Sequence, residues 1–210
     1  MTSPLKIAVI LAAGLGSRLK EHTQNKPKAF LEIDGKSLII RSIESLLALG
    51  MEKIIIGTGY LNSYFDELSK TYPQVVTMRN NEYATTGSMY TLYTVRKLIH
   101  ESFLLLEGDL LYEPAALDYL VKDEHEDIVL ASDATHSGDE VYIQCSKQGF
   151  LQTMSKERGS LGHADGELVG ISKLSMDALN RMIAFAEENY HKNKKGIHYE
   201  DALVGIASGR

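Results

Sequence analysis

The sequence has little of what marks secreted, zinc-binding or membrane-spanning proteins. Its 210 residues include one cysteine, Cys145, which excludes an internal disulfide framework and leaves a cysteine-based zinc site without its ligands. The histidines are scattered without the spacing of metal ligands. No apolar run approaches the roughly 20 residues that a membrane-spanning helix needs. We therefore expect a cytoplasmic protein with no membrane partner.

Positive charge is also scarce, yet it is concentrated in one place. The formal net charge is −6, from 22 Lys and Arg against 28 Asp and Glu. A basic group nevertheless falls within a short stretch, namely Arg18, Lys20, Lys26 and Lys28. A basic cluster on an acidic chain favours a small polyanion over nucleic acid as the ligand. A chain of this length with 44% hydrophobic residues is expected to form one domain with one core.

A glycine-rich loop follows the first apolar segment of the chain. Residues 7–11 are apolar and rich in β-branched side chains, which is typical of a strand buried on both faces of a parallel sheet. Gly14 and Gly16 then permit positive φ, so that bare N–H groups can approach an anion. Arg18 adds a planar cation with several donors, and Lys28 adds a point charge. The pattern indicates a phosphate-binding loop.

Two other glycine-rich motifs are excluded by the residues themselves. The dinucleotide motif G-x-G-x-x-G requires a third glycine at the position of Leu19. The NTPase loop G-x-x-x-x-G-K-[ST] requires a Gly-Lys-Ser/Thr triplet that does not follow here. The phosphate-binding loop therefore belongs to another class.

Apolar and amphipathic segments alternate along most of the chain. The pattern predicts strands at residues 7–11, 53–57, 75–78 and 103–106, and helices at residues 38–47, 61–68, 88–99 and 199–207. Strands and helices that alternate in this way form right-handed βαβ units. We expect an α/β fold with a Rossmann-like, mostly parallel sheet and helices on both faces. Ligands of such sheets bind beyond the carboxyl ends of the strands, where the glycine-rich loop falls.

A carboxylate follows the strand predicted at residues 103–106. Asp109 lies at the expected ligand edge, and a carboxylate next to a triphosphate is suited to binding Mg²⁺. Glu107 and Glu113 have weaker claims on the metal. The alternative role of Asp109 is that of a turn or helix-cap residue before Pro114.

The segment at residues 80–88 is polar and opens the predicted helix at residues 88–99. Side-chain amides and hydroxyls of Asn80, Thr86 and Ser88 can hydrogen-bond the edge of a base. Capping the helix is the competing role for Thr86 or Ser88. Both roles stay open, and one residue can serve both.

One motif carries a family resemblance. The string L-A-A-G-x-G-x-R at residues 11–18, followed by the P-K pair at residues 27–28, resembles the signature of nucleotidyltransferases that activate small phosphorylated acceptors. The fuller string is similar to the branch of phosphocholine and 2-aminoethylphosphonate cytidylyltransferases, and the resemblance extends over essentially the whole chain. It implies the nucleotidyltransferase fold, CTP as the nucleotide, Mg²⁺ as the cofactor and pyrophosphate as the leaving group.

The resemblance also implies roles for single residues. Gly14, Gly16 and Arg18 would hold the β- and γ-phosphates. Lys28 would lie at the α-phosphorus, and Asp109 would bind the metal. With the polar segment included, the expected nucleotide-binding residues are Leu11, Ala12, Ala13, Gly14, Gly16, Asn80, Thr86, Gly87 and Ser88.

The character of the chain changes after residue 131. Residues 132–166 combine strand-like pieces at 140–145 and 150–154 with glycine-containing turns. We expect a small β-rich insertion that covers the acceptor, as mobile lids commonly do. By resemblance to relatives with a basic residue at the comparable position, Lys156 would neutralise the acceptor's phosphate or phosphonate. The expected catalytic residues are Arg18, Lys28 and Lys156.

The other end of the acceptor is predicted from charge and aromatic residues. A quaternary ammonium group favours an aromatic cage, and the chain has no tryptophan. A primary ammonium group favours carboxylates. Acidic pairs beside tyrosines favour an aminoethyl acceptor over choline, although tyrosines alone can form a cage and acidic pairs are commonly just solvated. The expected acceptor-binding residues are Asp139, Glu140, Tyr142, Glu167, Tyr199 and Glu200.

The chain departs from the resemblance at its end. Relatives continue into another strand and helix that carry a second acidic metal ligand, whereas this sequence ends at Arg210. We expect residues 1–210 to be a single nucleotidyltransferase domain that is incomplete at its C-terminus, with fusion to a further domain and a homodimer both open. Two other functions stay open: a sugar-1-phosphate nucleotidyltransferase that uses UTP or dTTP, and an inactive nucleotide-binding module.

Overall fold

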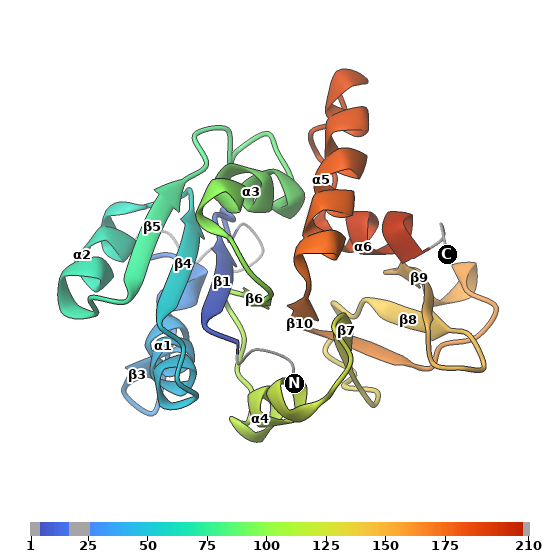
Figure 1. Cartoon of the computed structure of the whole chain (residues 1–210), viewed down its shortest axis with the longest axis horizontal. Helices are drawn as coiled ribbons and strands as arrows, with labels where there is room; N and C mark the ends of the chain where they lie inside the picture. Colours follow the sequence, from blue (N-terminus) through green and yellow to red (C-terminus); the bar gives the residue numbers. More distant parts are fainter. Residues whose placement is uncertain (1–4, 17–25, 208–210) are drawn as a thin grey trace.

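The computed structural model describes residues 5–16 and 26–207 and shows one central sheet with helices on both faces (Figure 1). Its strands are β1 (Ile7–Ala12), β4 (Lys53–Thr58), β5 (Val75–Arg79), β6 (Phe103–Glu107), β7 (Ile128–Ser132), β8 (Tyr142–Cys145), β9 (Leu151–Ser155) and β10 (Gly166–Leu174). Within the described residues these form an eight-stranded sheet whose main path runs β5-β4-β1-β6-β10-β8-β9, with β7 paired to β10. A separate hairpin consists of β2 (Glu32–Ile33) and β3 (Lys36–Ser37).

The strands β5, β4, β1 and β6 form a parallel half of the sheet. In its middle, Val9 of β1 lies opposite Ile55 of β4 on one side and Leu105 of β6 on the other. Val9 joins the core on one face, and its neighbours Ala8 and Ile10 join the core on the opposite face. Because both faces are buried, these strands are apolar throughout rather than alternating, as the sequence predicts.

Helices cover both faces of the sheet. They are α1 (Leu38–Ala48), α2 (Ser63–Thr71), α3 (Ser88–Val95), α4 (Ala115–Lys122), α5 (Met176–His191) and α6 (Tyr199–Ala207), with short 3₁₀ turns η2 (Lys28–Phe30), η3 (Arg96–Leu98) and η4 (Arg158–Ser160). Side chains of α1, α2 and α4 pack with Ala8 and Ile10, and side chains of α3, α5 and α6 pack with Val9. The predicted fold class is confirmed. None of the described helices is long and apolar enough to cross a membrane.

The other half of the sheet is antiparallel, which the sequence did not predict. β10 runs antiparallel to β6, and both β7 and β8 run antiparallel to β10. The pairing of β10 with β7 shifts register between Leu168 and Ser172, and Gly170 in this bulge has a φ of 86°. A bulge inserts an extra residue and breaks the two-residue alternation from which a strand is predicted.

The predicted insertion at residues 132–166 contains β8 and β9, which begin at Tyr142 and Leu151 rather than at residues 140 and 150. The two strands pair with each other, and Tyr142 also lies opposite Glu167 of β10. They therefore extend the central sheet. α6 packs against β9, so the last described helix lies beside the insertion (Figure 1).

Candidate active site

A pocket of about 580 Å³ lies beyond the carboxyl ends of β1 and β6 and gathers most of the predicted site residues. Its walls come from the loop after β1, the turn η2, the end of β6, the residues before α3, the insertion and the start of α6. The predicted residues that line it are Leu11, Ala12, Ala13, Gly14, Gly16, Lys28, Thr86, Gly87, Ser88, Asp109, Asp139, Lys156, Tyr199 and Glu200.

The glycine-rich loop follows β1 into the pocket. Gly16 has a φ of 64°, the left-handed conformation that was predicted and that favours glycine. The same prediction was wrong for Gly14, which has no positive φ. A Cβ on Gly14 would meet no atom of the described residues within 4 Å, so its missing side chain leaves the backbone open at the pocket. Arg18 lies outside the described residues.

An ion pair between Lys28 and Asp109 joins two elements at the pocket. Lys28 begins η2, which is anchored by the buried side chain of Phe30. Phe30 packs edge-on against Phe65 of α2, with ring centroids 5.0 Å apart. The side chains of Lys28 and Asp109 stay 37% and 29% exposed, so a ligand can reach both.

Asp109 reaches its position because Gly108 lets the ends of β1 and β6 approach closely. The N–H of Gly108 donates to the carbonyl of Leu11 at 2.9 Å. A Cβ on Gly108 would lie 2.7 Å from the Cβ of Ala12, a contact that any larger residue would have to relieve by moving the loop. Glycine here fixes the separation between the glycine-rich loop and Asp109.

A buried carboxylate lies beside this ion pair. Glu107, the last residue of β6, accepts a hydrogen bond from the hydroxyl of Tyr199 at 2.8 Å. Burial raises the pKa of Glu107 to about 7, and the negative charges of Glu200 and Asp109 add to the rise. The Tyr199 hydrogen bond opposes it. Tyr199 is 2% exposed, and its bonded hydroxyl joins α6 to β6. Its neighbour Glu200 is therefore better placed than Tyr199 to contact an acceptor.

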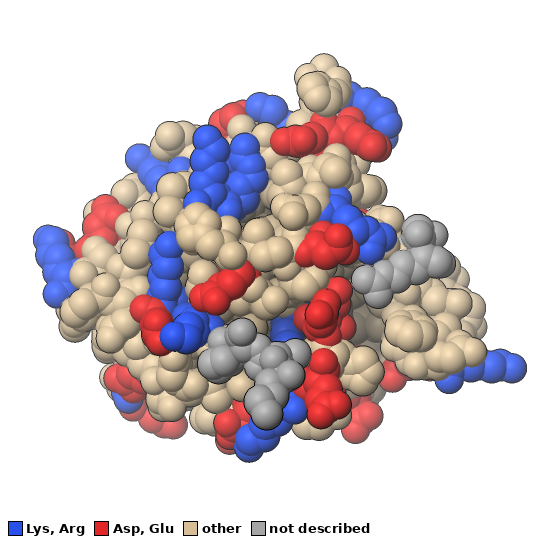
Figure 2. Space-filling model, in the orientation of Figure 1, with Lys and Arg blue, Asp and Glu red and all other residues tan. Residues whose placement is uncertain are grey.

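Glu200 brings a second carboxylate to the pocket. Its Oε2 atom is buried and has no hydrogen-bond partner among the described residues. Burial raises the pKa of Glu200, and the charge of Lys156 opposes the rise. Lys156 lies 3.3 Å from Asp139, measured between Nζ and Oδ1, and both are exposed at the mouth of the pocket. Acidic and basic side chains are similarly intermixed over the face drawn in Figure 2.

Asn80 does not line the pocket and is only 1% exposed. Its amide nitrogen donates to the hydroxyls of Thr86 at 3.0 Å and Thr91 at 3.1 Å, and its oxygen accepts from the backbone N–H of Glu82 at 2.9 Å. The expected contact between Asn80 and a base is therefore wrong for this structure. The Asn80 amide is bonded within the chain instead and holds the loop at residues 80–88.

The structure also decides the capping question at α3. The N-cap is Gly87, and no side chain caps the helix. The hydroxyl of Thr86 donates to the carbonyl of Glu82 at 2.8 Å, and the hydroxyl of Ser88 accepts from the backbone N–H of Tyr199 at 3.0 Å. Capping by Thr86 or Ser88 is thus wrong, and both residues line the pocket.

Three residues expected at the acceptor lie away from the pocket lining. Glu140 is half-buried and accepts from the backbone N–H of Gly138 at 2.9 Å. Tyr142 lies under the guanidinium of Arg158, 5.9 Å from its ring centroid. Glu167 is 5% exposed, and its carboxylate accepts two hydrogen bonds from Thr135. Of the residues expected at the acceptor, Asp139, Tyr199 and Glu200 line the pocket, and the Tyr199 hydroxyl is already bonded to Glu107.

The pocket also contains residues that the sequence did not single out as ligand contacts. Tyr83 and His198 both line it, and so does Glu107, for which the sequence indicated only a weaker claim on the metal. Tyr83 lies inside the polar segment at residues 80–88, which was a usable signal. His198 directly precedes the Tyr199-Glu200 pair, but the spacing of histidines along the chain gives information only on metal sites. Nothing in the sequence connects Glu107 to Tyr199, which is 92 positions away.

The α/β fold, the glycine-rich loop and the Lys28–Asp109 pair together define a nucleotidyltransferase. The chain belongs to the family of MobA-like NTP transferase domains, whose family model matches residues 8–182. A solved structure described as the inositol-1-phosphate CTP transferase from T. maritima has the same fold. It superposes with a TM-score of 0.84 and 18% identity, over 100% of this chain and 84% of that one.

Curated relatives include cytidylyltransferases and a uridylyltransferase. A choline-phosphate cytidylyltransferase from Streptococcus pneumoniae is 30% identical over 94% of this chain and 82% of that protein. A 2-aminoethylphosphonate cytidylyltransferase from Lancefieldella rimae is 28% identical over 94% of this chain and 78% of that protein. A UTP–glucose-1-phosphate uridylyltransferase from Haloferax volcanii is 34% identical over 70% of this chain, which spans 59% of that protein.

Proposed function

We propose that this protein transfers CMP from CTP to a small phosphonate or phosphate acceptor and releases pyrophosphate. The favoured acceptor is 2-aminoethylphosphonate, with phosphocholine or phosphoethanolamine next. One observation carries the proposal: a single pocket is lined by the Lys28–Asp109 pair and also by Lys156 and Glu200. The cytidylyltransferase names of two relatives support it.

The nucleotide side would act by positioning and by stabilising charge. Lys28 is suited to the α-phosphate, where negative charge develops as the bond to the leaving group breaks. The open backbone at Gly14 and the left-handed turn at Gly16 are suited to the β- and γ-phosphates, together with Arg18. No protein nucleophile is needed, because the acceptor itself carries the attacking oxygen.

Magnesium fits the donors on this side of the pocket. Asp109 offers a hard oxygen ligand that is 29% exposed, and the carboxyl of Glu107 is close enough to interact with it. No group of three or more His, Cys, Asp or Glu residues suited to a metal occurs in the described part of the chain, so Asp109 would share the metal with phosphate oxygens. A bound metal would neutralise charge on those oxygens.

The acceptor side would supply a nucleophile that is already ionised. A phosphate monoester has a second pKa of about 6 and is largely a dianion at pH 7, so no strong general base is required. An acceptor oxygen would attack the α-phosphorus of CTP, forming the new P–O bond while the bond to the β-phosphate oxygen breaks. Lys156 would hold the incoming phosphonate, and pyrophosphate would leave with the electron pair.

The preference for a primary ammonium group rests on Glu200. A buried carboxylate oxygen without a donor is unfavourable unless a ligand supplies one. An –NH₃⁺ group has three donors to give, whereas a trimethylammonium group has none and favours aromatic faces. The aromatic side chains that line the pocket in the described residues are those of Tyr83 and Tyr199. These observations favour an aminoalkyl acceptor.

The uridylyltransferase relative provides the competing function, a sugar-1-phosphate nucleotidyltransferase. The test measures pyrophosphate release with Mg²⁺ for CTP, UTP, dTTP and ATP, each against 2-aminoethylphosphonate, phosphoethanolamine, phosphocholine and glucose 1-phosphate. We expect CTP with 2-aminoethylphosphonate to have the highest kcat/KM. Faster turnover of UTP or dTTP with glucose 1-phosphate would establish the sugar enzyme instead. Absence of release from every pair would indicate an inactive binding module.

A further inference from the structure

Two segments that are far apart in the sequence meet along one wall of the pocket. The loop at residues 80–88 leads into α3, and the segment at residues 195–199 connects α5 to α6. The N–H of Gly87 donates to the carbonyl of Lys195 at 2.9 Å. A Cβ on Gly87 would lie 2.0 Å from the carbonyl oxygen of Ile197, so only glycine permits this approach. We call this contact the seam.

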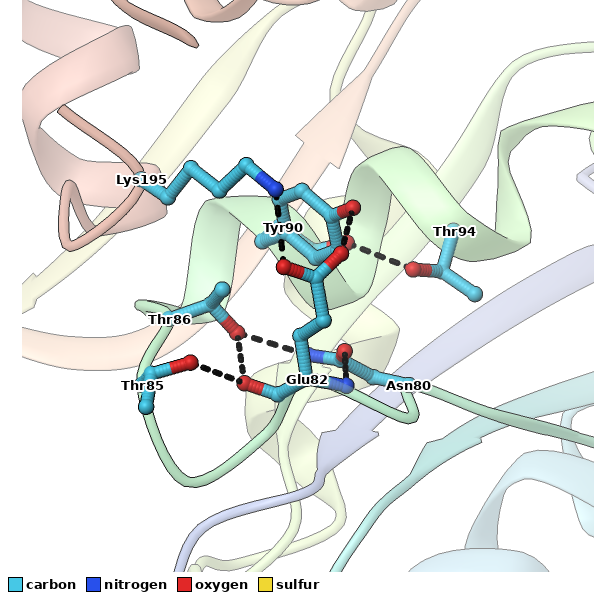
Figure 3. A network of polar contacts seen from close by, with 7 residues as sticks. All are labelled: Asn80, Glu82, Thr85, Thr86, Tyr90, Thr94 and Lys195. Carbon is cyan, nitrogen blue, oxygen red and sulfur yellow. Dashed lines mark hydrogen bonds and ion pairs between the residues drawn. The ribbon is translucent and has the colours of Figure 1, made fainter. Parts of the chain in front are cut away.

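An ion pair between Glu82 and Lys195 joins the two segments at the outer end of the seam (Figure 3). One carboxylate oxygen of Glu82 accepts from Nζ of Lys195 at 2.7 Å, and the other accepts from the hydroxyl of Tyr90 at 2.5 Å. Nζ of Lys195 also lies 5.1 Å from the ring centroid of Tyr90. The ion pair raises the pKa of Lys195 and lowers that of Glu82, so both groups stay charged at neutral pH.

The two sides of the seam are anchored differently. The loop at residues 80–88 has its own buried support, because Asn80 bonds Thr86, Thr91 and the backbone of Glu82. The segment at residues 195–199 is held at its far end by the buried Tyr199 and by Ile197, which packs against the core, so its outer residues Lys195 and Gly196 depend on the contacts across the seam. Loosening the ion pair should therefore loosen the segment from its outer end and leave the loop in place.

The loosened segment is the one that would serve the acceptor. It leads directly into Glu200, and it contributes His198 and Tyr199 to the pocket. The loop across the seam contributes Thr86 and Ser88, which belong to the nucleotide side. We propose that the Glu82–Lys195 ion pair is a latch that positions the acceptor side of the pocket against the nucleotide side. This rests on the proposed function, and both latch residues are positioning residues that touch no substrate.

The latch predicts an asymmetric kinetic effect. Glu82→Gln or Lys195→Met should raise the KM for 2-aminoethylphosphonate by about 2–5-fold, the range that an exposed ion pair supports. The KM for CTP and the kcat should stay close to wild type, because the loop keeps its buried support. Lys195→Arg keeps the charge and should restore most of the acceptor KM. The measurement varies each substrate while the other is saturating.

The chain offers a matched control in Lys6. Its Nζ lies 2.6 Å from Oε1 of Glu52, and its carbonyl accepts from the backbone N–H of Glu52 at 2.8 Å, so Lys6, like Lys195, combines an ion pair with a backbone hydrogen bond to its carbonyl. The exposures of the two lysine side chains are also close, at 43% and 40%. Lys6 precedes β1, at the amino ends of the parallel strands, whereas the pocket lies beyond their carboxyl ends. Lys6→Met should leave both KM values unchanged.

Hydrogen exchange tests the latch without turnover. Peptides that cover residues 195–199 should exchange about 2–5-fold faster in Lys195→Met than in wild type, while peptides from β4 should exchange as in wild type. Unchanged exchange at residues 195–199 would overturn the latch even in a protein with no detectable turnover. In an active protein, equal effects on both KM values, no effect on either, or the same effect from Lys6→Met would also overturn it. If wild type shows no turnover, the proposed function is refuted, and the exchange test still decides whether the latch exists.

Discussion

The parallel and antiparallel halves of the sheet support the two sides of the pocket in different ways. In the parallel half, Val9, Ile55 and Phe103 are fully buried among apolar neighbours. In the antiparallel half, most residues of β8 and β9 are only partly buried, and Phe150 between them is 64% exposed. The glycine-rich loop and Asp109 are thus attached to a two-sided core, whereas Asp139 and Lys156 of the insertion have a thinner support. Substitutions should affect stability in the first half and acceptor binding in the second.

A Phe-to-Ala substitution in each half should give the largest difference between the halves in the free energy of unfolding. Phe103→Ala should lower the free energy of unfolding by about 3–5 kcal/mol, because it leaves a cavity in a closed core. Phe150→Ala should lower it by less than about 0.5 kcal/mol, because that ring is already in solvent. Urea denaturation measures both. Similar losses for the two variants would mean that the halves share one core.

Removing Lys28, the cation that we propose for the α-phosphate, should have the next largest effect. Lys28→Ala should lower kcat by about 10²–10³-fold, the size of effect seen when a preorganised charge-stabilising donor is lost. Lys26→Ala is the control, because Lys26 lies two positions away and pairs with Glu32 at 2.6 Å instead. Wild-type turnover from folded Lys28→Ala would remove Lys28 from the mechanism.

The acceptor side is tested by removing the charge of Glu200. Glu200→Gln should raise the KM for 2-aminoethylphosphonate about 10–100-fold and leave the KM for CTP unchanged, because a charge-assisted hydrogen bond contributes about 1.5–3 kcal/mol. Ethylphosphonate lacks the amine, so wild type and variant should handle it equally. Glu140→Gln, in the insertion but outside the pocket lining, should change neither constant. An unchanged acceptor KM in Glu200→Gln would argue against recognition of an ammonium group.

The smallest predicted effect distinguishes a structural tyrosine from a ligand contact. Tyr199→Phe removes the hydrogen bond to Glu107 and should lower the free energy of unfolding by about 1–2 kcal/mol, with a modest rise in acceptor KM. Tyr93→Phe removes a similar bond to Glu187 at the surface and should have less effect. A large rise in acceptor KM at unchanged stability would instead show that Tyr199 touches the acceptor.

The parallel half and its ligand edge could be predicted because the signals are local. An apolar strand followed by two glycines, and a second apolar strand followed by Asp109, specify both elements and their common edge. The ion pair of Lys28 with Asp109 lies at that edge. The antiparallel half could not be predicted in the same way, because the bulge at Gly170 interrupts the alternation of β10.

Contacts between distant residues limited the prediction of the site. Asn80 has a side-chain amide that could contact a base, yet this amide points into the fold and is hydrogen-bonded there. Polarity in a loop does not reveal on which side of the loop a side chain lies. Tyr199 meets Glu107 from 92 positions away, and Lys195 meets Glu82 from 113 positions away. Only the fold brings these pairs together.

The central claim is that one pocket joins CTP to an aminoalkyl phosphonate. Phosphorus NMR of a reaction with CTP, Mg²⁺ and 2-aminoethylphosphonate tests it most directly, because it identifies the bond that forms. We predict two mutually coupled signals from a phosphonate–phosphate anhydride, together with one equivalent of pyrophosphate. Pyrophosphate with free CMP and unchanged 2-aminoethylphosphonate, or no consumption of CTP, would contradict the claim.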